Sequence, residues 1–260
     1  MLEFDEKTKA ILEIAYTGAD FVKRRRLNFE AVRPAVGDTI LDLGCGNGFL
    51  SQELANAVGP TGRVIGVDPS ADMLQSAKER CANSPQVELH EGFADAIPLS
   101  DNSVDAVVSV QVFEYIPDLA AAVAEVARVL KPGGRVAIGD MHFDTWAWHS
   151  ADEARMSAMM ESWDQHLAHR DVPAQLPQLF AAAGLIVEEL RPMTFIEHQL
   201  KADGMARMLT ILMSAFAIQN KHLPEETVND WLNEQTALES EGRFFHAITH
   251  VVVTGRKPDA

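Results

Sequence analysis

Three glycines at alternate positions follow an apolar run, and an acidic residue stands just before them. Residues 39–48 read TILDLGCGNG. Such glycines let the backbone adopt positive φ and let a ligand approach the main chain. The helix expected directly afterwards offers free N–H donors and a partial positive charge. Phe49 stands where the dinucleotide fingerprint G-x-G-x-x-G needs its third glycine, and Asp42 suits a ligand with an ammonium group better than a pyrophosphate. The spacing therefore disfavours a nicotinamide oxidoreductase.

A second acidic residue, Asp68, ends the apolar run 64–67. It lies about twenty residues beyond the glycines, a spacing at which a strand-end carboxylate accepts the hydroxyls of a ribose. The alternative is an acid at a helix start, beside the N-cap candidate Ser70. The upstream glycines favour ribose binding.

Residues 42–48 resemble the first motif of class I S-adenosylmethionine (SAM) dependent methyltransferases. Segments 64–70, 91–105, 109–118 and 130–136 resemble later parts of the family in the same order. The resemblance is to the small-molecule, ubiquinone/menaquinone-type subgroup. It implies SAM as cofactor, S-adenosylhomocysteine (SAH) as product and a small-molecule acceptor. The cofactor-binding residues that it implies are Asp42, Gly44, Cys45, Gly46, Asp68, Pro69, Met73, Phe93, Ala94, Asp95, Gln111, Val112, Tyr16 and Arg25.

Phe93 departs from the family pattern, because many members carry an acid immediately before Ala94 that meets the adenine amino group. Three alternatives stay open. Asp95 replaces that acid, the Ala94 backbone and apolar walls hold the adenine, or Phe93 stacks on the purine.

Methyl transfer from a sulfonium is an in-line displacement, so the protein mainly aligns the nucleophile, excludes water and, for some acceptors, removes a proton. We name His142, His149 and Glu114 as candidate general bases. An aromatic, His-rich segment also arises from simple packing, and no metal site is expected.

The acceptor region is expected to be aromatic. The residues that we expect to line it are Tyr115, Phe143, Trp146, Trp148 and Phe245. These rings would suit an aromatic or heterocyclic acceptor, although core packing explains them equally well.

Alternating strands and helices position these residues. Strands are expected at 39–43, 63–68, 86–91, 104–110 and 134–140, and helices at 49–58, 70–82 and 119–130. This alternation predicts an α/β fold with a parallel sheet. The family adds a Rossmann-like, seven-stranded, mostly parallel sheet with helices on both faces and an antiparallel pair at the edge, from 185–190 and 247–254.

We expect one methyltransferase domain over 1–260, with two N-terminal cover helices in 1–36 and a SAM-binding core in 37–140. Residues 141–172 and 197–246 would form a helical lid and acceptor region. Segments 173–196 and 247–260 would complete the sheet.

The amino-acid composition limits the classes of binding partner that we expect for the protein. The formal net charge of −16 argues against a nucleic-acid backbone or an anionic membrane, and no apolar run is long enough for membrane insertion. Two cysteines, Cys45 and Cys81, form no disulfide framework, so we expect reduced thiols and a cytoplasmic location. The sequence leaves a monomer or a homodimer open.

Three functions remain in competition. The first is a small-molecule methyltransferase. The second is a non-catalytic SAM-binding regulatory protein, which the intact glycine loop disfavours. The third is another group transfer on the same fold, such as aminopropyl transfer, for which residues 109–115 lack the expected paired acids.

Overall fold

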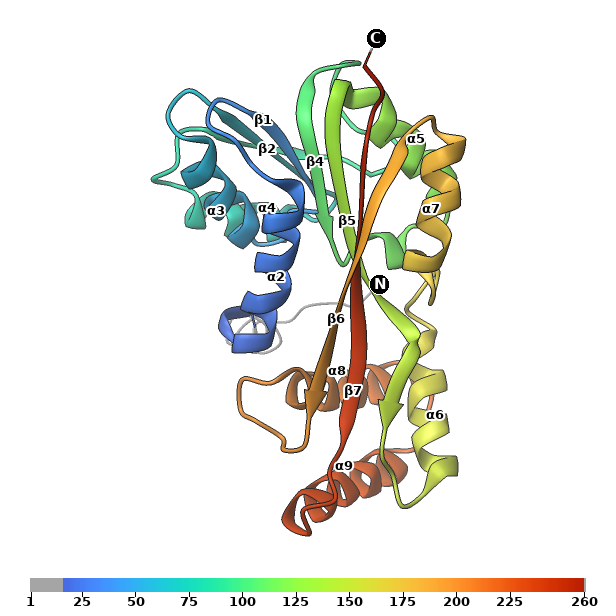
Figure 1. The fold of residues 1–260 in the computed structure, drawn as a ribbon. Helices are drawn as coiled ribbons and strands as arrows, with labels where there is room; N and C mark the ends of the chain where they lie inside the picture. Colours follow the sequence, from blue (N-terminus) through green and yellow to red (C-terminus); the bar gives the residue numbers. More distant parts are fainter. Residues whose placement is uncertain (1–15, 260) are drawn as a thin grey trace. The chain divides into compact units, whose positions relative to one another are not determined.

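The computed structural model describes residues 16–259, which alternate strands and helices along most of the chain (Figure 1). The strands are β1 (Thr39–Leu43), β2 (Arg63–Asp68), β3 (Val87–Glu91), β4 (Val104–Val110), β5 (Leu130–Trp148), β6 (Ile186–Glu197) and β7 (His246–Arg256). The helices are α2 (Ala19–Val32), α3 (Phe49–Val58), α4 (Ala71–Arg80), the 3-10 turn η1 (Phe113–Tyr115), α5 (Leu119–Val129), α6 (Glu153–Asp164), α7 (Val172–Ala182), α8 (Met205–Gln219) and α9 (Glu225–Ser240).

The strands form one seven-stranded sheet in the order β3-β2-β1-β4-β5-β7-β6. Pairs β1–β2, β1–β4, β2–β3 and β4–β5 are parallel, and β6 and β7 form the antiparallel pair at the edge. The strand order reverses between β1 and β4. In open α/β sheets, ligands bind outside the carboxyl ends of the strands at such a point.

The chain divides into two compact units. Among the described residues, the sheet unit comprises Arg25–Met141, Asp171–Pro192 and 251–259. The helical unit comprises 16–24, His142–Arg170 and Met193–His250. Strands β5, β6 and β7 each begin in one unit and end in the other.

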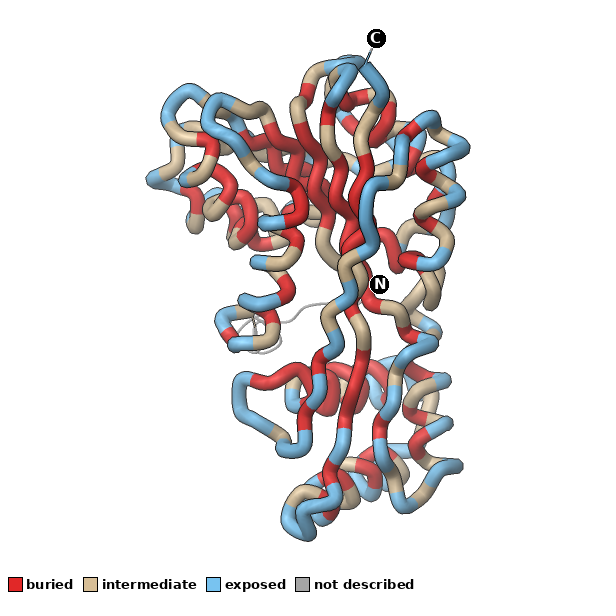
Figure 2. Tube along the Cα trace, in the orientation of Figure 1, coloured by how far each residue is buried: buried red, intermediate tan, exposed pale blue. Residues whose placement is uncertain are grey.

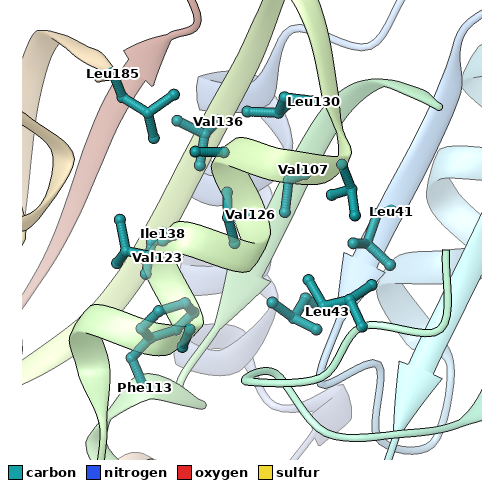
Figure 3. Close-up of a cluster of buried hydrophobic side chains, with 14 of the residues drawn as sticks. Leu41, Leu43, Val107, Phe113, Val123, Val126, Leu130, Val136, Ile138 and Leu185 are labelled. Atoms are coloured by element: carbon teal, nitrogen blue, oxygen red, sulfur yellow. The ribbon is translucent and has the colours of Figure 1, made fainter. Parts of the chain in front are cut away.

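The sheet unit has a core on each face of its strands, because successive strand residues point to opposite sides. Ile40, Val64 and Val108 pack with residues of α2 and α3. Leu41, Leu43 and neighbouring strand residues pack with Phe113 and with residues of α5 such as Val123 and Val126 (Figure 3). Burial on both faces explains the near-continuous apolar strands β1, β2 and β4, which are mostly buried (Figure 2).

The helical unit contains α6, α8 and α9 together with the outer ends of the three long strands. Its interior is aromatic. The ring of Trp148 meets those of His246, Trp231 and Phe244 at centroid separations of 4.7, 5.4 and 6.4 Å. Trp231 is fully buried, with a relative exposure of 0%.

The structure confirms the expected fold class, and it corrects one prediction of secondary structure. Residues 141–148 are not helical but continue β5, whose strand runs on to Trp148. Tryptophan, phenylalanine and threonine favour a half-buried pleated surface, and this segment is rich in them. The edge strands also extend past their expected ends at Leu190 and Thr254. The first expected N-terminal helix lies outside the described residues, and the second is α2.

Candidate functional site

The glycine loop after β1 is shaped by positive φ values at all three of its glycines, Gly44, Gly46 and Gly48. Gly44 has φ +73°, and a Cβ on it would stand 2.2 Å from a Val112 methyl, so the loop after β4 packs directly on it. Gly46 has φ +52°, and a Cβ there would meet nothing within 4 Å. The loop is therefore closed on one side by Val112 and open at Gly46, where a ligand can reach the main chain.

Asp42 lies below the loop, near the carboxyl end of β1, with a relative exposure of 2%. Its Oδ2 accepts a 2.6 Å hydrogen bond from the hydroxyl of Ser51 in α3. Burial is the main cause that raises the pKa of Asp42 to about 7, and the nearby carboxylates Asp68 and Glu53 add to it. A ligand ammonium beside this carboxylate would oppose that shift, because an opposite charge favours the ionised form.

Asp68 joins the loop to the start of α4. Its two oxygens accept backbone hydrogen bonds of 2.9 Å each from Gly46 and Ser70. Burial raises its pKa, and the two backbone bonds oppose that rise. A carboxylate has about four acceptor positions, so two remain for hydroxyl groups of a ligand. The Ser70 side chain caps α4 by accepting a 3.3 Å hydrogen bond from the Met73 N–H, so the structure confirms the N-cap. Ribose binding by Asp68 stays a prediction.

Phe93 follows β3 and is 59% exposed. Its main chain forms a bridge with Ala96, so the turn that carries Ala94 and Asp95 is ordered around it. Asp95 is exposed and Ala94 half-buried. Stacking of a purine on this exposed ring and adenine recognition by Asp95 both stay predictions.

The segment after β4 contains a strained residue. Gln111 has φ +58°, a conformation that residues with a Cβ rarely adopt, and its N–H donates to the Gly139 carbonyl at 2.7 Å. Strain of this kind costs about 1–3 kcal/mol and clusters at functional sites. The resemblance places Gln111 among the cofactor-binding residues, and this role stays a prediction with which the strained backbone agrees.

Beyond Gln111, two acidic side chains are buried together. Glu114 and Asp140 both have relative exposures of 0%. Asp140 at β5 accepts backbone hydrogen bonds from Val112, Phe113 and Glu114. Burial and the neighbouring Glu114 raise the pKa of Asp140 well above its usual value. Asp140 thus holds the turn η1, which carries the candidate base Glu114.

The other predicted residues lie as follows. Pro69 is exposed, Cys45 is buried and Met73 half-buried in the sheet unit, where Tyr115 is 42% exposed. Arg25 pairs with Glu53 at 2.8 Å and lies over the ring of Phe49, at the start of α3. Tyr16 belongs to the helical unit, where its ring meets that of Phe21 edge-on at 5.8 Å.

The remaining acceptor and base candidates, His142, Phe143, Trp146, Trp148, His149 and Phe245, all belong to the helical unit. Half-buried His142 has a buried Nδ1 without a hydrogen-bond partner among the described residues. His149 is exposed, and its N–H bonds the Phe245 carbonyl at 2.9 Å. Phe143 and Trp148 are buried, and Trp146 meets both rings within 5.8 Å. These contacts agree with a packing role, and their role toward an acceptor stays a prediction.

Sequence reasoning missed two residues of the site. Ser51 stands three residues after Gly48, on the first turn of α3, where its hydroxyl reaches back to Asp42. Asp140 is the last residue of the expected strand 134–140. An acid at the carboxyl end of a parallel strand is a signal from which this site residue could have been predicted.

No group of three or more His, Cys, Asp or Glu side chains capable of holding a metal occurs in residues 16–259. None of the helices described there is long and apolar enough to cross a membrane.

The fold and this loop define a class of protein: an α/β protein with a Gly-rich cradle after β1 and a strand-end acid after β2. Residues 41–138 match the family model described as "Methyltransferase domain". Over these residues the chain is similar to the class I SAM-dependent methyltransferases.

Two of the curated proteins that share sequence with the chain are described by their identity and coverage. An uncharacterized 37.1 kDa protein in transposon TN4556 of Streptomyces fradiae is 33% identical over 228 residues, which cover 87% of this chain and 65% of that protein. Demethylmenaquinone methyltransferase of Desulfitobacterium hafniense is 40% identical over 120 residues, which cover 45% of this chain and 47% of that enzyme. The chain thus spans less than two thirds of either relative's length.

Among solved structures, the YcgJ protein from Bacillus subtilis has a TM-score of 0.64 with 17% identity, and the match covers 92% of this chain and 100% of that one. At this identity the likeness concerns the fold. The two proteins therefore share their overall fold over the matched length.

The residues present fit SAM. Open space at Gly46 admits a ligand to the main chain, and Asp68 keeps acceptor positions for the ribose. Asp42 supplies a buried carboxylate near the loop for the ammonium of the methionine part.

Proposed function

We propose that the protein transfers a methyl group from SAM to a small-molecule acceptor, with an aromatic or heterocyclic acceptor favoured. The observation that carries the proposal is that Asp68 links the glycine loop to the start of α4. Its carboxylate accepts backbone hydrogen bonds from Gly46 in the loop and from Ser70 before α4. The demethylmenaquinone methyltransferase relative supports a small-molecule acceptor.

SAM supplies a methyl group on a sulfonium that is already a good leaving group. The chain's own residues then hold the donor, and the site has to align the acceptor and keep water away. Strained Gln111 and the Asp140-held turn fix the main chain after β4. We propose that Glu114, His142 or His149 acts as the general base. It removes a proton from the methyl acceptor when that acceptor reacts through a hydroxyl group or an acidic carbon.

The same proposal covers domain organisation, location and acceptor. The chain is one methyltransferase domain, in which segments 141–172 and 197–246 form the lid and residues 37–140 form the core. The protein acts in the cytoplasm, where its cysteines, both free in the structure, stay reduced. Its acceptor is a metabolite-sized molecule rather than a nucleic acid, as the acidic composition suggests.

Calorimetry with SAH tests the cofactor site. The Asp68→Ala variant is expected to lose about 10- to 100-fold in affinity, because hydrogen bonds to a charged group contribute about 1.5–3 kcal/mol each. Asp68→Asn keeps one carbonyl oxygen as acceptor and should lose less. Asp72→Ala, in the exposed first turn of α4, is the matched control and should bind SAH like the wild type.

Unchanged SAH binding in Asp68→Ala would refute the ribose assignment. A screen of aromatic and heterocyclic acceptors with methyl-labelled SAM then tests activity. Tight SAM binding with no labelled product in that screen would favour the regulatory alternative instead.

A further inference from the structure

A cavity of about 340 Å³ opens in the helical unit, lined by residues of α8 and α9 and by Leu200 before them. This volume lies at the lower end of the range for small-molecule pockets. Leu200, Ile211 and Leu232 form an apolar wall, whereas Arg207 and Gln235 contribute nitrogen donors. No residue of the proposed cofactor site belongs to it.

The side-chain amide of Gln235 has a defined orientation. Its Oε1 accepts a 2.9 Å hydrogen bond from the indole nitrogen of Trp148. An indole N–H is a donor only, so the oxygen of the amide must face Trp148 and the NH₂ group must point the other way.

The NH₂ group of Gln235 has no hydrogen-bond partner within residues 16–259, although the side chain is 0% exposed and lines the cavity. A buried donor left unsatisfied is costly, and such groups in folded proteins normally have a partner. Because Gln235 lines the cavity, a ligand bound in it is the partner that we consider.

The three hydroxyl groups that line the cavity already donate hydrogen bonds to backbone carbonyls. Thr210 donates to the Arg207 carbonyl, Ser214 to the Thr210 carbonyl and Thr236 to the Leu232 carbonyl, at 2.7, 2.7 and 3.0 Å. The available donors are therefore the Gln235 amide and the Arg207 guanidinium. A ligand must supply acceptor atoms to match them.

Arg207 adds a charge. Its side chain is exposed at the cavity, and no carboxylate of the described chain forms an ion pair with it, although the protein carries 38 acidic against 22 basic residues. A guanidinium matches the planar geometry of a carboxylate, which it can bind through two parallel N–H bonds.

We propose that this cavity binds a small carboxylate with an apolar, ring-sized body. The carboxylate receives hydrogen bonds from Gln235 and Arg207, and the ring packs on Leu200, Ile211 and Leu232. This site stands on residues of the helical unit alone, so it does not depend on the proposed methyl transfer.

Benzoate is the probe, and its neutral isostere benzamide is the comparison. We expect saturable binding of benzoate in calorimetry with a Kd below about 1 mM and at least fivefold weaker binding of benzamide. In an NMR titration of nitrogen-labelled protein, the indole N–H signal of Trp148 should move, because its acceptor Gln235 binds the probe.

Three variants locate the site. Arg207→Gln removes the exposed cation without touching the core and should weaken benzoate binding at least fivefold, whereas the exposed control Lys201→Gln should not. Gln235→Glu keeps an oxygen acceptor for Trp148 and replaces the donor group, so it should abolish binding. If Gln235→Glu does not fold, the comparison of Arg207→Gln with Lys201→Gln decides alone.

Absence of saturable benzoate binding would overturn the proposal, as would equal affinity in wild type and Arg207→Gln. Benzoate binding that saturating SAH abolishes by competition would also overturn it, because the probe would then occupy the cofactor site. Loss of SAH binding in Asp68→Ala with benzoate binding unchanged would support both sites as separate.

Discussion

At the residue scale, the raised pKa of Asp42 predicts that the affinity for the cofactor depends on pH. Its pKa is raised to about 7 in the free protein, chiefly by burial. A ligand ammonium binds the ionised form, so affinity for SAH should fall as pH drops from about 7 to about 5, approaching tenfold per unit. Calorimetry across this range measures the slope.

The Asp42→Asn variant is the control for that slope, since it keeps an acceptor for Ser51 but has no charge to lose. It should bind SAH more weakly than wild type near pH 7 and show little pH dependence. Folding stability should change with pH in the opposite direction to SAH affinity. Because the folded-state pKa is raised, the free protein should lose stability as pH rises from about 4 to 7. A wild-type affinity that is flat from pH 5 to 7 would contradict the assignment.

Gly46 gives a second residue-scale prediction. In Gly46→Ala, the new methyl group enters open space in the free protein, where it would stand in the way of the ligand. We expect SAH affinity to fall at least about tenfold, while the left-handed backbone costs about 1–2 kcal/mol of stability.

Gly184→Ala is the matched control for the backbone cost. Gly184 has φ +76°, also meets nothing within 4 Å and follows α7, away from the loop. It should lose similar stability in thermal or urea unfolding but keep SAH affinity. Equal affinity of Gly46→Ala and wild type would place the ligand elsewhere.

At the scale of elements, local patterns predicted the sheet unit well. Continuous apolar strands, glycine and proline punctuation, and the βαβ alternation are short-range signals, and α3 was predicted at its observed bounds. The glycine loop and Asp68 could be paired in advance because the ends of adjacent parallel strands meet at one edge.

The elements that sequence reasoning misjudged depend on long-range contacts. Residues 141–148 continue β5 in part because they pair with distant chain. The Thr249 N–H donates to the Thr145 hydroxyl at 3.0 Å, and the His149 N–H to the Phe245 carbonyl. Neither partner is visible in the local sequence, and aromatic composition alone did not choose between strand and helix.

The turn η1 yields an element-scale prediction through Asp140. Burial beside Glu114 raises the pKa of Asp140, so the folded state holds a proton that the unfolded state releases above about pH 4. Stability should therefore fall as pH rises above that value. In Asp140→Asn, which keeps an oxygen to accept the backbone N–H groups of the turn, this fall should be smaller. Urea unfolding from about pH 4 to 8 measures it, and equal slopes in the two proteins would contradict it.

At the scale of the whole molecule, the proposed single domain predicts one cooperative response to cofactor. All four tryptophans (Trp146, Trp148, Trp163 and Trp231) belong to the helical unit, whereas the proposed cofactor-binding core lies in the sheet unit. Tryptophan emission thus reports on one unit and far-UV circular dichroism on both. SAH at about 100 times its Kd stabilises the protein to which it binds by about 2.7 kcal/mol.

For a single domain, both signals should melt together, and SAH should raise both midpoints equally, by several degrees. The Asp68→Ala variant is the control and should show a much smaller shift. If SAH raises the circular dichroism midpoint and leaves the tryptophan midpoint in place, the two units unfold separately, and the cofactor stabilises only the unit that binds it. That outcome would replace the one-domain proposal with two domains joined by β5, β6 and β7.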